Sequence, residues 1–120
     1  MADQKPAITY DDFAKLDFRV GTIVEATAPD WSKKLLRFVV DFGADIGKRT
    51  IFSGIKAFVQ PEDVIGKQYV FLVNLAPKKM GEEESQGMMV MADVVSPDGT
   101  DDKVQLIPLQ TPVENGTVVR

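Results

Sequence analysis

Side chains that could bind an anion gather in the second half of the chain. Lys78 and Lys79 are adjacent in a segment rich in proline and glycine, and Ser85 and Met88 follow it. Ammonium groups bind phosphate oxygens, a hydroxyl can bond phosphate or sugar, and a polarizable thioether can lie against a base. The stretch is typical of a surface that holds an anionic ligand, although a solvated loop would use the same residues.

A second group of candidate binding residues lies closer to the N-terminus. Lys33, Lys34 and Arg37 supply positive charge there. Trp31 presents an aromatic face, and stacking a base on such a face contributes about 1–3 kcal/mol. The indole could equally cover the end of the fold or a subunit contact. Asn74 offers a donor and an acceptor, which suit either a base edge or a turn cap.

Side chains for covalent or metal-assisted catalysis are scarce in this chain. Its 120 residues include no cysteine and no histidine. Disulfides, thiolate metal ligands and the usual general base are therefore excluded. Carboxylates remain, but they fall mostly in polar, turn-like stretches typical of a solvated face. We expect no catalytic residue, no metal and no cofactor.

Charge is distributed unevenly along the chain. The formal net charge is −4, which argues against a general nucleic-acid binder because Lys and Arg neutralise phosphates. Residues 33–79 nevertheless hold nine basic and four acidic side chains, so this block carries +5 and the remainder −9. If these basic side chains form one surface patch, the patch would orient a bound polyanion without binding every polyanion tightly. Lysines scattered over several faces for solubility would give the same count.

The elements that must position these residues are predicted to be mostly strands. A capping-box pattern that begins at Thr9 predicts a short helix over 10–15. Alternating and β-branched residues predict strands over 18–26, 35–42, 48–52, 68–74, 87–95 and 103–108. Single helical turns are expected at 55–59 and 61–66, and Gly21 indicates a bulge or bend. The order of the first five strands, with a helical insertion after the third, is that of the all-β, five-stranded OB-fold barrel.

The chain is expected to form one domain with an extension at each end. We assign residues 1–9 to a flexible N-terminal segment, 10–95 to the barrel and 96–120 to a C-terminal extension. Apolar residues in the last segment would stay exposed unless they pack on the barrel or across a twofold axis. The apolar runs are too short to span a membrane, and the N-terminus lacks an apolar signal core. We therefore expect a cytoplasmic protein with no membrane partner.

Seven short motifs occur in a recognisable order and spacing. They are KLDFRVG at 15–21, KLL at 34–36, VDFG at 40–43, IFSGI at 51–55, PEDVIGK at 61–67, NLAPKK at 74–79 and SQGM at 85–88. Together they resemble the tRNA-binding domain at the C-terminus of methionyl-tRNA synthetases, over about two thirds of the chain. The family has Pro-x-Ala-Asp-Lys-Leu after its first strand, whereas residues 29–35 read PDWSKKL. Either Lys33 or Lys34 could therefore take the family's lysine position.

The resemblance implies non-catalytic, structure-selective binding of tRNA by an OB fold. It implies a homodimer, either joined to a synthetase catalytic domain in the same chain or independent. The implied tRNA-binding residues are Lys33, Lys34, Arg37, Asn74, Lys78, Lys79, Ser85 and Met88. Related CsaA-like proteins have chaperone activity, so binding of unfolded polypeptide in an apolar groove is the alternative function. Salt should weaken tRNA binding steeply and leave an apolar groove unaffected.

Overall fold

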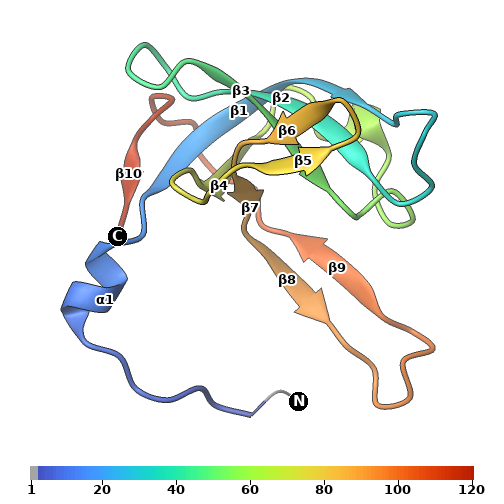
Figure 1. Cartoon of the computed structure of the whole chain (residues 1–120), viewed down its shortest axis with the longest axis horizontal. Coiled ribbons are helices and arrows are strands. Elements are labelled where there is room, and N and C mark those ends of the chain that lie inside the picture. The colour runs from blue at the N-terminus through green and yellow to red at the C-terminus, as the bar shows by residue number, and fades with distance from the viewer. Residues whose placement is uncertain (1–2) are drawn as a thin grey trace.

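The structure of the protein is a computed structural model that describes residues 3–120, and its regular secondary structure is almost entirely strand (Figure 1). Residues 1 and 2, part of the expected flexible segment, lie outside the described residues. Five antiparallel strands form a nearly closed barrel in the order β3-β2-β1-β4-β7. They are β1 (Phe18–Thr27), β2 (Leu36–Asp41), β3 (Lys48–Ser53), β4 (Gln68–Leu72) and β7 (Met88–Met89). The predicted all-β, OB-like barrel is confirmed.

The core fills the barrel because alternate side chains of each strand point inward. In β2, Leu36, Phe38 and Val40 are buried and the residues between them are half-buried. Phe42 and Phe71 meet edge to face with their ring centroids 5.4 Å apart, an arrangement that the ring quadrupoles favour. The outer face of β2 is thereby left for polar contacts.

β1 is the longest strand and changes partners along its length. Its first half pairs with β4 and its second half with β2. The register shifts between Ile23 and Glu25, so the predicted irregularity lies beyond Gly21. Gly21 itself has a packing role. A Cβ atom there would lie 2.5 Å from Cγ1 of Val40 and 2.7 Å from Cε1 of Phe42, which leaves no space for a larger residue.

Side chains complete the barrel between β3 and the segment that precedes β7. The backbone N–H of Gln86 donates to the carbonyl of Thr50 at 2.9 Å, and the N–H of Thr50 donates to Oε1 of Gln86 at 3.0 Å. The N–H of Phe52 donates to Oγ of Ser85 at 3.0 Å. Two polar side chains therefore take the place of strand carbonyls where the barrel closes.

The chain after β4 differs from the prediction in two places. A loop was expected between the fourth and fifth strands, but the segment folds into a hairpin of β5 (Lys78–Met80) and β6 (Glu83–Ser85) that lies over the barrel (Figure 1). The single strand expected over 87–95 is broken, because β8 (Met91–Val94) leaves the barrel and pairs with β9 (Lys103–Leu106). Periodicity could not reveal the break, since the alternation of residues continues while the pairing partner changes.

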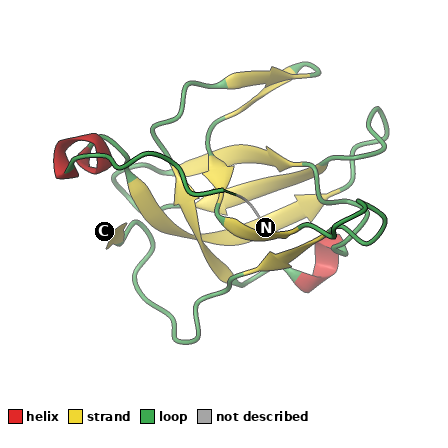
Figure 2. Ribbon diagram, turned by 90° about the horizontal axis from the view of Figure 1, so that it is seen from below, coloured by secondary structure: helices red, strands yellow, loops and turns green. Residues whose placement is uncertain are grey.

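The remaining elements lie at the ends of the barrel (Figure 2). α1 (Tyr10–Ala14) begins with the predicted capping box, in which Oγ1 of Thr9 accepts the N–H of Asp12 at 3.3 Å. The turn after β3 is closed by donation from Phe58 N–H to the Ile55 carbonyl at 2.9 Å, and η1 (Pro61–Asp63) is a 3₁₀ turn.

The last part of the chain returns to the barrel. β10 (Val118–Val119) pairs with the start of β1. The N–H of Gly116 donates to the carbonyl of Val20 at 2.8 Å, and the N–H of Leu109 donates to the carbonyl of Gln68 at 2.9 Å. Backbone hydrogen bonds thus join residues 109, 116 and β10 to β1 and β4.

Candidate nucleic-acid interface

The loop before β2 presents two exposed lysines, and a third lies beside them. Oγ of Ser32 accepts the N–H groups of Lys34 and Leu35, both at 3.2 Å, so a side chain fixes the loop backbone. The N–H of Lys56 donates to the carbonyl of Lys34 at 3.1 Å. Lys33, Lys34 and Lys56, here called the edge lysines, are all exposed. Sequence reasoning did not single out Lys56, because only the fold places it beside Lys34.

The two lysines of the β5–β6 hairpin project from opposite faces of it. Lys78 pairs with Ser85 and Lys79 with Glu84, and successive strand residues point to opposite sides. Lys78 therefore shares a face with Ser85, whose hydroxyl contacts β3, whereas Lys79 shares the outward face with Glu84. Both lysines are exposed, but because they point to opposite faces they do not form a single binding site.

Arg37 is held by two carboxylates. Its Nε and Nη2 atoms donate to Oε2 and Oε1 of Glu83, both at 2.8 Å, and its Nη1 donates to Oε1 of Glu25 at 3.2 Å. This bidentate hydrogen bonding to Arg37 lowers the pKa of Glu83. The ion pair fastens β6 to the outer face of β2, so the structure gives this predicted binding residue a local structural contact.

Two further predicted site residues also contact the protein itself. Ser85 is buried, and its hydroxyl oxygen accepts the hydrogen bond from the Phe52 N–H described above. Oδ1 of Asn74 accepts the N–H of Asp17 at 2.9 Å, and its Nδ2 donates to the carbonyl of Lys15 at 2.7 Å. Asn74 thus caps the segment between α1 and β1. Met88 differs from both, because 49% of it is exposed on β7.

Trp31 lies between the barrel and the tip of the β5–β6 hairpin. Its ring centroid is 5.9 Å from that of Phe52. A Cβ atom at Gly81 would lie 3.0 Å from Cζ2 of Trp31, so the glycine backbone lies against the indole. The rest of the indole is open to solvent, and Trp31 as a whole is 55% exposed. A cavity of about 500 Å³ opens beside it, lined by Trp31, Met80, Gly81, Glu82 and Glu83.

The lysines and arginines of the molecule differ in their partners. Nε of Arg19 lies 2.6 Å from Oδ1 of Asp17, and Arg37 binds Glu25 and Glu83. Within residues 3–120, by contrast, no carboxylate lies within 4.0 Å of the edge lysines or of the two hairpin lysines. These five ammonium groups are therefore available to bind phosphate, as are those of Lys48 and Lys67, which also have no ion pair among the described residues.

Residues 3–120 contain no cluster of three carboxylates that could hold a metal ion. In the same part of the chain, no helix has the length and apolar character needed to cross a membrane.

Comparison with known proteins identifies the family. The profile described as "Putative tRNA binding domain" matches residues 18–118. Methionine–tRNA ligase of Flavobacterium psychrophilum is 53% identical over 96 residues, which are 80% of this chain and 13% of the ligase. The ligase of Salinibacter ruber is 42% identical over 113 residues, which are 94% of this chain and 15% of the ligase. The chain thus spans only 13% and 15% of these two relatives.

Solved structures agree with the sequence comparison. The MetRS-related protein from Pyrococcus horikoshii superposes with a TM-score of 0.84 at 39% identity, over 97% of this chain and 100% of that one. The chaperone CsaA from Bacillus anthracis superposes with a TM-score of 0.79 at 29% identity, over 96% and 100%. Because the family profile covers most of the chain, the protein belongs to the family of tRNA-binding domains found in the C-terminal region of methionyl-tRNA ligases.

Proposed function

We propose that the protein is a non-catalytic, dimeric domain that holds tRNA by its shape for a synthetase catalytic domain in the same chain. The observation that carries this proposal is the set of edge lysines without carboxylate partners, on a chain whose net charge is −4. These ammonium groups bind phosphates of a tRNA that is already oriented by repulsion from the acidic faces. Tethering raises the effective concentration of tRNA at the catalytic domain.

In this proposal the predicted site divides into two groups. The edge lysines, Lys78, Lys79 and Met88 contact the RNA, because their side chains are exposed. Arg37, Asn74 and Ser85 support them, because their polar atoms bind other parts of the protein. Phosphate contacts position an RNA without reading its bases, so the arrangement of the lysines selects the fold of tRNA over other RNA.

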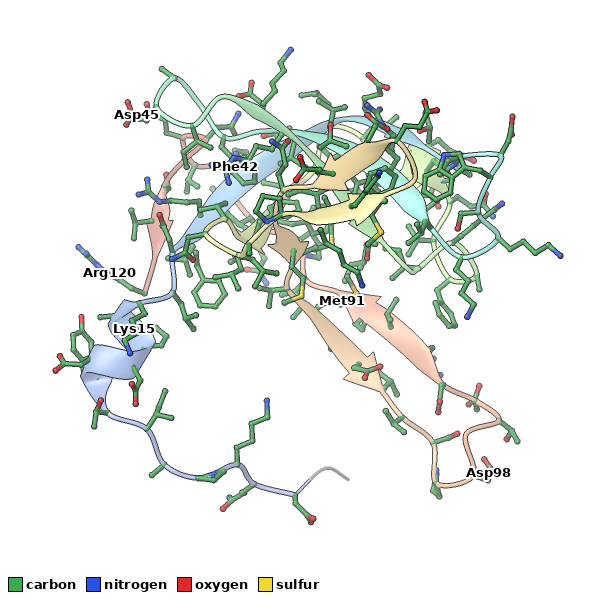
Figure 3. The ribbon with its side chains drawn as sticks, in the orientation of Figure 1. Lys15, Phe42, Asp45, Met91, Asp98 and Arg120 are labelled. Atoms are coloured by element: carbon green, nitrogen blue, oxygen red, sulfur yellow. The ribbon has the colours of Figure 1, made fainter. Side chains whose placement is uncertain are left out.

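We further propose that a second copy of the chain covers an apolar face. A cavity of about 300 Å³ lies where α1, β1, β4 and β10 meet, lined by Phe13, Phe18, Val70, Val90, Ile107, Val119 and Arg120. α1 contributes no buried residue, and both it and the β8–β9 hairpin extend from the barrel (Figure 3). A five-residue helix and a two-stranded hairpin are each marginal in water on their own. A twofold partner would stabilise both.

Salt dependence with lysine variants tests the tRNA proposal. Each phosphate contact removed should lower the slope of log affinity against log salt by about 1 and weaken binding of all tRNAs alike. We expect this for Lys34→Ala and Lys56→Ala in gel-shift or fluorescence titrations of intact tRNA. Lys103→Ala on β9 removes the same charge from the other hairpin and should leave the slope unchanged.

Two further RNA-binding experiments set limits on the proposal. Lys78→Ala and Lys79→Ala are to be measured separately, because the two side chains point to opposite faces. Unfolded tRNA, or a single-stranded RNA of the same length, should bind more weakly than folded tRNA. Equal affinity for folded and unfolded RNA would overturn shape selection, and unchanged slopes in both edge-lysine variants would overturn the site.

The apolar cavity also favours a second candidate function, binding of unfolded polypeptide. Its lining residues are almost all apolar, and the CsaA structure that superposes on this chain is described as a chaperone. Peptide binding in this cavity would resist salt, would be lost in apolar-to-charged variants of the lining and would survive Lys34→Ala. The opposite pattern is expected of tRNA binding.

A further inference from the structure

We propose that the cavity beside Trp31 is a site for a single unpaired guanine base of a bound RNA. The inference rests on the proposed RNA-binding function and adds base recognition to it. Three features of the cavity carry the argument: an aromatic wall, a rim of hydrogen-bond acceptors and a rigid attachment to the barrel.

The wall is the indole of Trp31. Phe52 and the backbone of Gly81 contact it, yet 55% of the residue is exposed. The indole is therefore held in place while much of its surface stays open. Unpaired RNA bases are bound by stacking on such aromatic side chains. Met80 lines the same cavity, and its thioether can contact the edge of a base.

The rim carries carboxylates. Glu82 and Glu83 both line the cavity. Glu83 is occupied by Arg37, whereas within residues 3–120 no basic group lies within 4.0 Å of Glu82. An ionised carboxylate only accepts hydrogen bonds and has two oxygens for adjacent donors. Guanine presents two adjacent donors, N1–H and N2–H₂, on its Watson–Crick edge. In adenine and cytosine, an acceptor nitrogen lies next to the one amino group, and in uracil a carbonyl lies on either side of the one N–H.

The same carboxylates fix the direction in which a nucleotide enters. They repel phosphate, so the sugar and phosphate must lie away from the hairpin tip. Lys33 and Lys34 follow Trp31 closely in the chain, are exposed and do not line the cavity, so in this proposal they supply the phosphate contacts. The edge lysines then bind the backbone while the base points at Glu82.

The attachment makes the site rigid. Arg37 fastens Glu83 to β2, and Ser85 fastens the end of β6 to β3. Gly81 has a φ of 63° at the first position of the two-residue turn, a left-handed conformation that favours glycine. Because the hairpin tip is set before RNA arrives, little conformational entropy is lost when the base binds.

The test uses the fluorescence of Trp31, the one tryptophan in the chain. The probes are short oligouridylates that carry one central guanosine, adenosine or cytidine, or none. We expect quenching of the indole and about tenfold tighter binding of the guanosine probe than of the other three, as is typical of a bidentate contact to a base edge. Equal affinities for the four probes would overturn the proposal.

Variants separate stacking from edge recognition. Glu82→Gln should bring the ratio of affinities for the guanosine and uridine probes close to one. Glu84→Gln removes the same charge from the outward face of the hairpin and should keep the ratio. Trp31→Ala should weaken all four probes about tenfold, whereas Trp31→Phe retains a stacking surface and most of the affinity. Because both variants lack the one tryptophan of the sequence, their affinities and that of the native protein are compared by fluorescence anisotropy of dye-labelled probes. A guanosine preference that survives Glu82→Gln would overturn the proposal.

Failure of this inference is distinguishable from failure of the proposed function. A native protein that binds folded tRNA with the expected salt slope, yet treats the four probes alike, lacks the guanine site and keeps the function. A native protein that prefers the guanosine probe but does not bind folded tRNA has the site and lacks the function.

Discussion

The two hairpins of this protein differ in how they are held. The β5–β6 hairpin lies on the barrel, where Arg37 binds Glu83, Ser85 binds the backbone of β3 and Gly81 contacts Trp31. The β8–β9 hairpin projects from the barrel, and the part nearest the barrel packs against the core through Met91, Val104 and Leu106 (Figure 3). Both have two short strands, so strand pairing does not explain the difference.

The difference lies in the chemistry of the contacts. Polar and charged groups hold the docked hairpin, and they fix the position of the cavity that it lines. The turn of the projecting hairpin is polar, but Val94, Val95 and Ile107 are exposed along its sides and at its root. A rigid tip suits recognition of a small group such as a base, whereas exposed apolar surface suits burial against another protein surface. We propose that the docked hairpin binds RNA and the projecting one binds a second copy.

The largest effect is expected from a charge placed at the root of the projecting hairpin. Ile107 lines the apolar cavity and is 52% exposed, so Ile107→Glu should leave the monomer folded. In a dimer that buries this face, the unpaired carboxylate would lose its hydration, which costs several kcal/mol. We expect the dimer dissociation constant to rise about 100-fold or more, measured by analytical ultracentrifugation.

A control variant makes this experiment specific. Thr111→Glu introduces the same charge in an exposed loop and should leave the association unchanged. If native protein is a monomer at every concentration, or if Ile107→Glu dimerises as the native chain does, the projecting hairpin does not bind a second copy.

The second effect concerns the docked hairpin and is expected in stability. Ser85→Ala leaves the buried N–H of Phe52 without its acceptor. An unsatisfied buried donor costs about 1–3 kcal/mol, so the urea midpoint should fall with little change in the slope of the transition. Ser53→Ala, on the half-exposed end of β3, should change stability less. The folded variant should keep its affinity for tRNA. A loss of that affinity without a loss of stability would show that Ser85 contacts the RNA.

Alternation along the chain was sufficient to predict the barrel. The parity of β2, the capping box at Thr9 and the proline at the start of η1 are local patterns, and each appears in the structure where the sequence placed it. The β5–β6 hairpin was missed because each of its strands is only three residues long, too short for alternation to show. For the β8–β9 hairpin the second strand was predicted, and the point at which the first strand leaves the barrel was missed. A strand from 87 to 95 and one that changes partners after Val90 have the same alternation.

The candidate site was predicted by residue type but not by orientation. Lys78 and Lys79 were taken together because they are adjacent, and a strand turns adjacent side chains to opposite faces. Ser85 was assigned to the ligand because hydroxyls bind phosphate, yet its hydroxyl closes the barrel. Lys56 joins the edge lysines only through its backbone bond to Lys34. Which polar groups bind the protein itself is a property of the packed fold.

The smallest effect is a pH dependence of the docked hairpin. The hydrogen bonds from Arg37 lower the pKa of Glu83 in the folded protein below its ordinary value. A carboxyl group with a lowered pKa contributes its stabilisation above the ordinary pKa and loses it as the pH falls through the lowered value. Docking should therefore be complete at neutral pH and weaken in acid, and Trp31, which contacts the hairpin tip at Gly81, should report it by fluorescence.

The matched variants decide whether Glu83 causes this transition. Glu83→Gln removes the ionisable group, so its fluorescence should be independent of pH over that range and resemble that of the acid form. Glu84→Gln keeps the Arg37 contact and should titrate as the native protein does. A native transition that persists unchanged in Glu83→Gln would show that the ion pair does not hold the hairpin. Because the pair is partly exposed, added salt should shift the transition in the native protein by weakening the attraction between the two groups.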